Sequence, residues 1–297
     1  MRLAVALLTI MIAAAGAFAQ SQTPPTLRIV TEDPNLPSDL YYGNIKVKPL
    51  RLRPGTNQVI TIDDKDFFIQ QQYIDFLGRM PDGLGFQNWM NTLSNCPNGG
   101  YGENDNPDCD RVHVSAGMFL SDEFRGRGFW VYRFYQATLG RRPKYAEFVP
   151  DMQRIGGSQS PDQEAVSKNA YMNDWVNRGE FKAKYDAITD PAAFVDAILQ
   201  TAGVTISNRD TLVNSLKSGQ MTRAQVVRAI IENPAIENNQ IQYYIPAFVS
   251  MQYFGYLRRD PDELGFNNWV QTLRANPSDY RHMIFGFIYS TEYRNRF

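Results

Sequence analysis

Three glutamates recur in similar short phrases, and a pair of carboxylates is the machinery with which many enzymes cleave glycosidic bonds. Glu123, Glu180 and Glu292 each stand directly before an aromatic residue in these phrases. In such an enzyme one carboxyl group protonates the leaving group while the other acts as nucleophile or base. Because all three acids fill the same slot, we expect them to cap helices or to pair with arginines such as Arg125 and Arg294. The chain is therefore predicted not to be an enzyme, and a carbohydrate-active enzyme using a carboxylate pair is the alternative.

No other catalytic apparatus is recognisable in the sequence. His113 and His282 are the only two histidines, and they lie far apart within helical patterns. A serine–histidine–aspartate triad or a zinc triad would need one of them. The chain also lacks a nucleophile elbow, an H-E-x-x-H motif and a glycine-rich phosphate loop. These absences exclude the common hydrolase and nucleotide-binding signatures.

Cys96 and Cys109 are the only two cysteines of the chain. An even, closely spaced pair in an oxidising compartment predicts a disulfide. Closing a loop of this size stabilises a fold by roughly 3 kcal/mol in the chain-entropy model. Two cysteines without a histidine at ligand spacing are poor evidence for zinc, so no metal is assigned to them.

The loop between the cysteines is rich in acids, and carboxylate oxygens are the ligands that calcium prefers. The spacing does not match the register of a known calcium loop. We therefore expect a solvated, disulfide-stapled loop that could meet a partner, with calcium-dependent adhesion as a further alternative. No cofactor other than calcium is considered. The acids in question are Glu103, Asp105, Asp108 and Asp110.

One phrase occurs twice, as QQYIDFLGRMPDGLGFQNWMNTL at 71–93 and as MQYFGYLRRDPDELGFNNWVQTL at 251–273. We expect its proline to begin a helix and its aspartate to accept hydrogen bonds from the free amides of the first turn. The arginine is expected to pair with that aspartate or to cap the preceding helix. The tryptophan, at helical spacing from a phenylalanine, is predicted to lie in the core instead of forming a sugar-stacking platform. The residues concerned are Arg79, Pro81, Asp82, Trp89, Arg259, Pro261, Asp262 and Trp269.

The elements that position these residues are predicted to be helices. Helical periodicity runs from about residue 64 to the last residue, and weaker copies of the phrase stand at 134–143 and, in degenerate form, at 194–203. The predicted fold class is all-α, with about four repeated helical-hairpin units packed together. A short extended or β-leaning N-terminal arm precedes them, with strand-prone runs at 27–30, 45–47 and 58–62. The expected domains are a signal peptide (1–19), the arm (20–63), a first pair of units with the disulfide loop (64–188) and a second pair (189–297).

Several helix boundaries are marked by capping residues. Thr222-x-x-Gln225 is a capping box, and Ser207-x-x-Asp210 is a looser version of one. Glycines such as Gly78 are expected to end helices.

The pattern Y-x-x-x-L-G-R-x-P-D-x-x-G-F-x-x-W, with a later S-x-E-[FY], resembles the family catalogued as domain of unknown function 4214. The resemblance covers roughly 65–297 in tandem copies and is strongest at the two ends. It implies a helical, bacterial, usually exported domain, often found beside adhesive or calcium-binding repeat modules. The phrase is more faintly similar to the helical linker domains of phycobilisomes, which are assembly proteins. Neither resemblance implies a catalytic residue.

The N-terminus indicates export. Arg2, an apolar run over 3–15 and the sequence Ala17-Phe18-Ala19 form a secretory signal peptide with cleavage expected after Ala19. No later stretch is apolar enough to span a membrane. We therefore expect a secreted or periplasmic protein.

Charge excludes some partners. Removing Arg2 with the signal peptide leaves 29 of the 30 basic residues against 31 acidic residues, a net charge of about −2. The basic residues are scattered, which disfavours nucleic acid as a partner. The sequence thus predicts an exported, non-catalytic interaction module of the cell surface, periplasm or extracellular space that binds a protein or a glycan at the cell envelope.

Overall fold

The structure is a computed structural model, and it describes all residues except 1–26, 31–38, 48–52, 54–57, 103–105 and 157–159. The expected signal peptide lies outside the described residues. The chain divides into two compact units, Met1–Arg51 and Leu52–Phe297.

The first unit contains a small antiparallel sheet with the strand order β1-β2-β3. Its strands are β1 (Leu27–Val30), β2 (Asp39–Tyr42) and β3 (Ile45–Val47). Leu27 pairs with Tyr42, and Leu40 pairs with Val47. Two of the three strand-prone runs are therefore strands, while 58–62 contains only an isolated bridge at Val59.

The second unit is helical throughout its described residues, as the periodicity predicted. Five π-helical turns and one 3₁₀ turn, labelled η, interrupt its α-helices. The α-helices are α1 (Lys65–Gln72), α2 (Gly83–Ser94), α3 (Arg111–Leu120), α4 (Asp122–Phe124), α5 (Trp130–Phe134), α6 (Tyr145–Gly156), α7 (Pro161–Trp175), α8 (Gly179–Tyr185), α9 (Pro191–Ala202), α10 (Arg209–Lys217), α11 (Arg223–Ile231), α12 (Pro234–Glu237), α13 (Ile245–Gln252), α14 (Glu263–Ala275), α15 (Tyr280–Ile288) and α16 (Thr291–Arg294). The η turns are η1 (Tyr73–Leu77), η2 (Arg125–Phe129), η3 (Tyr135–Leu139), η4 (Gln240–Tyr244), η5 (Tyr253–Leu257) and the 3₁₀ turn η6 (Pro277–Asp279).

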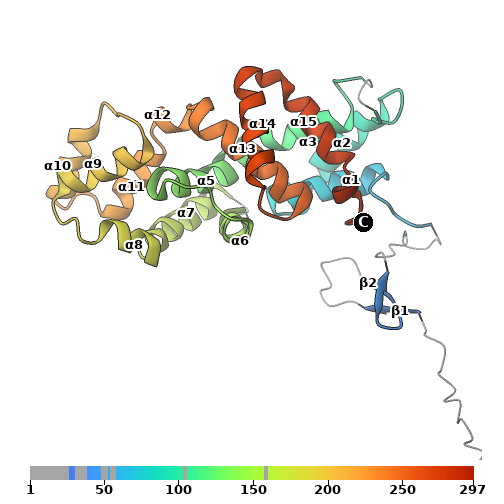
Figure 1. The fold of residues 1–297 in the computed structure, drawn as a ribbon, viewed down its shortest axis with the longest axis horizontal. Coiled ribbons are helices and arrows are strands. Elements are labelled where there is room, and N and C mark those ends of the chain that lie inside the picture. The colour runs from blue at the N-terminus through green and yellow to red at the C-terminus, as the bar shows by residue number, and fades with distance from the viewer. Residues whose placement is uncertain (1–26, 31–38, 48–52, 54–57, 103–105, 157–159) are drawn as a thin grey trace, which may run out of the picture. The chain divides into compact units, whose positions relative to one another are not determined.

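Helices from the two ends of the helical unit pack together. Figure 1 shows α1, α2 and α3 beside α14 and α15, while α8, α9 and α10 lie at the opposite end of this unit. The ring centroids of Phe76 and Tyr256, which occupy matching positions of the two strong phrases, are 4.9 Å apart. The Gln72 side chain donates to the Tyr293 hydroxyl (3.3 Å), so buried polar contacts also cross this junction.

Each copy of the phrase ends its helix in the same way. A π turn (η1, η3 or η5) runs from the tyrosine to the leucine, and the next residue adopts the left-handed conformation. That residue is Gly78 (φ 67°), Gly140 (φ 74°) or Arg258 (φ 53°). Glycine reaches this conformation at no steric cost, so Gly78 ends its helix as expected. Arg258 is the one non-glycine with positive φ among the described residues.

Two other helix starts show where local prediction succeeds and fails. Thr222 and Gln225 form the predicted capping box at the start of α11. The looser box at Ser207 is wrong, because the residue that precedes α10 is Asn208 and its side chain makes no capping bond. A capping spacing therefore needs the correct backbone conformation as well as the right residue types.

The boundary between the units differs from the one expected at residue 63. Residues 53 and 58–63 belong with the helices because side chains tie them there: Arg53 donates to Asp66 (2.5 Å), and Arg111 donates to the Asp63 carbonyl (2.6 Å). No division at residue 188 is found within the helical unit. There α9 packs against η3, so the expected first and second pairs share one core.

Two buried arginines in this core differ in how well they are bonded. Arg111 and Arg133 are each 1% exposed. Arg111 donates to the carbonyls of Ile62 (3.2 Å) and Asp63 (2.6 Å). Only the Nε of Arg111 lacks a hydrogen bond in the described structure, whereas both Nε and Nη1 of Arg133 lack one, and Nη1 pairs with half-exposed Glu237 at 3.3 Å. Burial lowers the pKa of both guanidinium groups.

This difference predicts opposite responses to the same substitution. Arg133→Met is expected to leave the free energy of unfolding within about 1 kcal/mol of wild type, or to raise it, because an incompletely bonded buried charge is replaced by an apolar chain. Arg111→Met is expected to cost about 3 kcal/mol, since buried carbonyls lose charged donors. Urea denaturation measures both; a larger loss for Arg133→Met than for Arg111→Met would contradict this reading.

Candidate functional site

Each glutamate of the recurring signature forms a bidentate ion pair with the arginine of the phrase before it. The two nitrogen–oxygen distances are 2.7 and 2.7 Å for Arg79–Glu123, 2.8 and 2.6 Å for Arg141–Glu180, and 2.6 and 3.0 Å for Arg259–Glu292. We call each pair an Arg–Glu clasp. The clasps join the ends of three segments: the first (73–127), the central (135–185) and the last (253–297).

The clasps decide the role of the repeated acids. Hydrogen bonds from Arg141 lower the pKa of Glu180, and those from Arg259 lower the pKa of Glu292. A general acid of a glycosidase needs a raised pKa. The expected arginine pairing is present, but the partner residues were wrong: Arg125 stacks on Tyr244 (5.2 Å), and Arg294 pairs with Asp63 (2.9 Å).

The aspartates of the phrase cap helices, as expected. Asp82 accepts from the Gly85 amide and Asp262 from the Gly265 amide, both at 2.8 Å. Pro81 and Pro261 lie one residue before these caps, outside α2 and α14, so their expected place in the first helical turn is wrong. The caps leave the arginines bound mainly to glutamate: the nearest Arg79–Asp82 and Arg259–Asp262 approaches are 3.6 and 4.0 Å.

The two tryptophans are half-buried and pack against the core from its edge. Each faces one of the two histidines, with ring centroids 6.0 Å apart for Trp89–His113 and 6.3 Å for Trp269–His282. His113 and His282 both stand ten residues before the clasp glutamate. The histidines therefore belong to the repeated structure, a relation that comparing the copies by offset could have found.

The central segment departs from this scheme at three matching positions. Ten residues after the clasp arginine it has Asp151 in place of a tryptophan, and two residues before the clasp glutamate it has Arg178 in place of a serine. Six residues after the clasp arginine it has Glu147 in place of glycine. Sequence analysis passed over all three residues because they break the pattern it was following.

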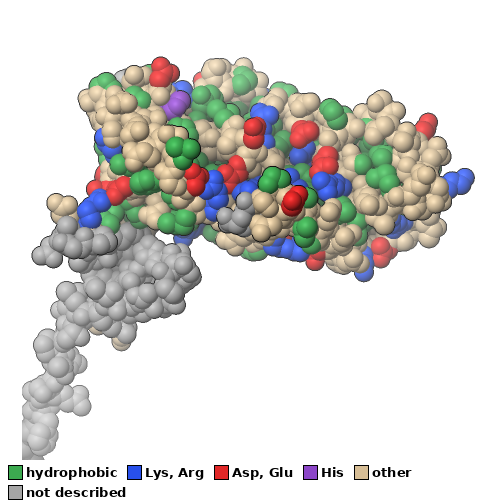
Figure 2. All heavy atoms as spheres, turned by 180° about the vertical axis from the view of Figure 1, so that it is seen from behind, with side chains coloured by type: hydrophobic (Ala, Val, Ile, Leu, Met, Phe, Trp, Pro, Cys, Tyr) green, Lys and Arg blue, Asp and Glu red, His purple; other side chains and the backbone are tan. Residues whose placement is uncertain are grey.

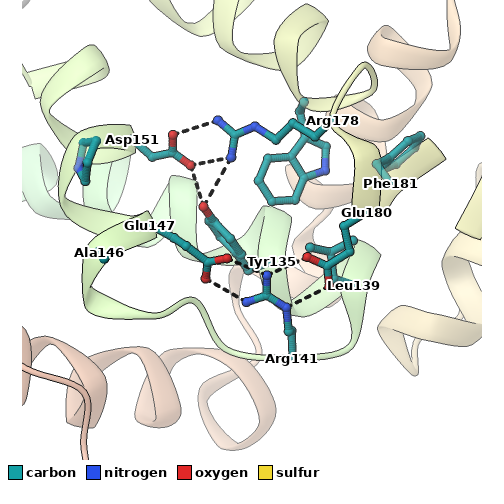
Figure 3. Close-up of a pocket in the computed structure, with 11 residues that line it drawn as sticks. Tyr135, Leu139, Arg141, Ala146, Glu147, Asp151, Arg178, Glu180 and Phe181 are labelled. Carbon is teal, nitrogen blue, oxygen red and sulfur yellow. Dashed lines mark hydrogen bonds and ion pairs between the residues drawn. The ribbon is translucent and has the colours of Figure 1, made fainter. Parts of the chain in front are cut away.

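Asp151 and Arg178 form an ion pair in which each balances the charge of the other. Arg178 donates to both carboxylate oxygens of Asp151 (2.7 Å each), and the Tyr135 hydroxyl donates to the same carboxylate at 2.7 Å (Figure 3). The Tyr171 hydroxyl also donates to it, at 2.9 Å. Asp151 is only 5% exposed, so this network satisfies a buried charge. Figure 3 also shows Arg141 between Glu147 and Glu180, with both carboxylates turned toward its guanidinium.

Glu147 stands where the other two segments have a glycine packed closely against a tyrosine. A Cβ atom at Gly85 would lie 2.5 Å from the Tyr73 hydroxyl, and at Gly265 one would lie closer still to Tyr253. A side chain at this position therefore holds its helix away from the tyrosine. The central segment has a cavity of about 300 Å³ there, lined among others by Tyr135, Leu139, Arg141, Asp151, Trp175 and Glu180.

The degenerate copy expected around 194–203 has no clasp. Gly203 takes the left-handed position (φ 68°). Val204 then stands at the arginine slot and Ala235 at the glutamate slot, and both pack partly buried against the core. An apolar pair has replaced the ion pair in this part of the chain.

The predicted disulfide joins Cys96 to Cys109, but the loop it closes is tied down at its described ends. The Gly102 amide donates to the Tyr289 hydroxyl (3.1 Å), and Arg281 donates to the Pro107 carbonyl (3.2 Å). These bonds attach the loop to the last segment. The solvated, disulfide-stapled loop expected from the sequence is exposed at Gly102, Asn106, Pro107 and Asp108, and its described ends also contact the last segment.

The four acids proposed for calcium do not form a shared site among the described residues. Glu103 and Asp105 lie outside the description. Asp108 is exposed, whereas Asp110 is 1% exposed, accepts from the His113 amide (2.6 Å) and pairs with Arg281. No group of three or more histidine, cysteine or acidic residues suited to a metal occurs in the described part of the chain.

An apolar groove of about 370 Å³ lies between α3, η4, α13 and α14. Leu120 and Ile241 at its edge are 56% and 52% exposed. Tyr244, Phe248 and Leu273 are among the other lining residues. The face seen in Figure 2 otherwise shows acidic and basic side chains interspersed, with no large area of one sign.

The length and apolar character of the described helices decide whether any of them could cross a membrane. None of them combines the length and apolar character needed to cross a bilayer.

The fold and the clasps define a helical protein built from Arg–Glu-clasped segments. A known family model matches the end of the chain. It is described as Domain of unknown function (DUF4214) and matches residues 245–297, which contain α13, α14 and the third clasp. The match is to one domain, and it extends neither to the tandem copies expected over 65–297 nor to phycobilisome linkers. No curated protein and no solved structure matches the chain.

The clasps predict that acid destabilises the fold. The folded pKa of Glu292 lies below its unfolded value, so its stabilising contribution is present above the unfolded pKa and is lost as pH falls through the folded one. Urea midpoints measured from pH 7 down to about pH 3 should therefore fall most steeply below about pH 5, and less so for Glu292→Gln. Asp108→Asn, which changes an exposed carboxylate outside the clasps, should keep the wild-type profile. An unchanged profile for Glu292→Gln would rule the clasp out as a source of this dependence.

A second prediction concerns the compensating pair of the central segment. Arg178→Met should lower the free energy of unfolding by about 3–5 kcal/mol because it leaves a buried carboxylate without its cation. The double variant Asp151→Trp/Arg178→Ser installs the residues of the other two segments and should be at least about 2 kcal/mol more stable than Arg178→Met. A double-mutant cycle by urea denaturation tests this; a double variant less stable than either of its single substitutions would contradict it.

Proposed function

We propose that the protein is an exported, non-catalytic interaction module of the cell surface, periplasm or extracellular space, and that it binds a protein or a glycan there. The observation that carries the proposal is the apolar groove edged by Leu120 and Ile241. Large apolar side chains exposed at the edge of a groove are typical of protein interaction sites. A protein partner is therefore favoured over a glycan at this groove.

The state of the acids supports a non-catalytic role. Arginine hydrogen bonds lower the pKa of Glu180 and of Glu292, which is opposite to what a general acid needs. The cavity of the central segment, with its aromatic and acidic lining, is the feature that favours the alternative, a carbohydrate-active enzyme. Glu147 would be a second acid of this cavity. Burial raises its pKa, but the hydrogen bonds and charges of Arg141 and Lys144 together outweigh burial and lower the pKa of Glu147 as well.

The three clasps also support a proposal about architecture. We infer that the first and central segments are diverged copies of the domain matched at 245–297, and that 194–236 is a fourth copy without a clasp. The shared π turn, left-handed residue and clasp geometry support this relation for the first, central and last segments. On this basis the chain is an array of about four helical-hairpin units.

Calcium-dependent adhesion remains a separate candidate. Exposed Asp108, beside acids outside the described residues, is the observation that favours it. Calorimetric titration with millimolar calcium tests it, and no heat together with no thermal shift would remove it.

The experiment for the main proposal uses the chain without its predicted signal peptide. Immobilised protein is exposed to an envelope extract of the source cell and, in parallel, to a glycan array. Leu120→Lys and Ile241→Lys each place a charge at the groove and are expected to weaken capture of the partner by about tenfold or more.

The matched control is Val166→Lys, which adds the same charge at an apolar side chain that is 68% exposed on α7. It should bind as wild type does. Equal loss in all three variants, no ligand in either screen, or shortening of an arrayed glycan by the wild-type protein would each overturn the proposal.

A further inference from the structure

A second cavity lies where the corner of the central segment faces the corner of the last segment. The stretch 140–144 forms one wall and 260–263 forms another, so that Pro143 and Pro261, which match in the phrase, both line it. Its volume is about 640 Å³, within the range of small-molecule sites. We call it the corner cavity.

Basic side chains outnumber acidic ones in its lining. Arg142, Lys144 and Arg274 stand against Asp260 and Glu263. Arg141 also lines the cavity, but two glutamates outside the lining, Glu147 and Glu180, bind it and more than balance its charge. Within the lining itself positive charges outnumber negative ones, and a ligand with a negative group would neutralise this excess.

Several of its donors have hydrogen-bonding capacity left. Arg142 donates from Nη2 to Glu263 and its guanidinium lies 4.2 Å from the centre of the Phe266 ring, and its other nitrogens make no hydrogen bond within the described structure. Arg274 directs Nε and Nη2 at the Ile241 carbonyl (3.2 and 3.0 Å) and has Nη1 to spare. The Lys144 side chain is exposed and makes neither a hydrogen bond nor an ion pair with the described residues.

Two carboxylates of the lining are each engaged through one oxygen. The Asp260 carboxylate accepts from the Tyr145 amide at 2.5 Å, and Glu263 is the partner of Arg142. The unbonded nitrogens of Lys144, Arg142 and Arg274 are the cationic donors that the cavity offers to a ligand.

The wall also contains a buried hydroxyl with no partner. Tyr132 on α5 is 1% exposed, and its hydroxyl oxygen lacks a hydrogen bond in the described structure. The Ser250 hydroxyl donates to the Pro246 carbonyl (2.9 Å) and lies near the phenol, but no hydrogen bond of normal length joins the two hydroxyls. Burial raises the pKa of Tyr132, so the phenol keeps its proton and remains a donor. An unsatisfied buried polar group of this kind calls for an explanation, and a bound ligand supplies one.

We propose that the corner cavity binds a small oxyanion-bearing molecule, with a carboxylate or phosphate group held by Lys144, Arg142 and Arg274 and approached by the Tyr132 hydroxyl. Arginine and lysine donate charge-assisted hydrogen bonds to both kinds of group. The site adjoins the apolar groove only through the Arg274–Ile241 contact, and it goes beyond the proposed function because it takes a different ligand.

The test is isothermal titration calorimetry of the chain without its predicted signal peptide, in a buffer of low ionic strength. The probes are sodium glucuronate, inorganic phosphate and, as the neutral counterpart, glucose. Glucuronate or phosphate should bind, and glucose should not. Tighter binding of glucuronate would identify the acidic group of the ligand as a carboxylate, and tighter binding of phosphate would identify it as a phosphate. Added salt should weaken the binding.

Three variants make the test specific. Lys144→Ala should weaken anion binding about tenfold, the loss expected for one charge-assisted hydrogen bond. Tyr132→Phe should weaken it too without lowering the melting temperature, since the removed hydroxyl has no partner in the free protein. Lys182→Ala removes the same charge from an exposed lysine on α8 and should change nothing.

The proposal is overturned if neither anion binds, if glucose binds as well as they do, or if Lys182→Ala weakens binding as much as Lys144→Ala. Unchanged affinity in both Lys144→Ala and Tyr132→Phe would also overturn it. Ile241→Lys should leave anion binding intact and Lys144→Ala should leave partner capture intact, so this proposal and the proposed function can fail independently.

Discussion

The helical unit depends on one interaction, the Arg–Glu clasp, which recurs three times with nearly the same geometry. Each clasp connects the residue after a left-handed turn to a helix start 33 to 44 residues further along the chain. The π turn and the left-handed residue aim the arginine, and the tyrosine ring beneath it limits its motion: the guanidinium lies 5.0 to 5.4 Å from that ring in all three cases. The partly exposed ion pairs add little free energy individually. Their planar, bidentate geometry instead specifies how the two ends of a segment meet.

A structural feature could be predicted from the sequence when the residues that form it lie close together along the chain. The caps at Asp82 and Asp262 act within three residues of themselves and were predictable, as was the disulfide between two neighbouring cysteines. The partner of Arg79 was missed because Glu123 lies 44 residues away, beyond the disulfide loop. The π turns have no compositional signature, so the sequence could not indicate them.

Departures from the repeat were harder still to foresee. Asp151 and Arg178 are each unremarkable surface-type residues in the sequence, and only their contact makes them a buried pair. The two histidines looked like isolated residues until both were found against matching tryptophans. In each case the information was present as a relation between copies, not within any single stretch. The three clasped segments share their clasp contacts and differ at other positions, and the central segment has a cavity of about 300 Å³ where two of these differences, Asp151 and Glu147, lie.

The contact between the two ends of the helical unit has a consequence for how the chain folds. Arg294 pairs with Asp63 at a separation of 231 residues, and the rings of Phe67 and Phe297 lie 5.5 Å apart. Contacts of such long range form late, because the loop they close costs entropy that is recovered only when the ends meet. In the export that we propose, with the N-terminus leading, α1 would emerge without the surface it packs on. The core of the first segment would then stay incomplete, with its apolar surface exposed, until residues near 294 emerge.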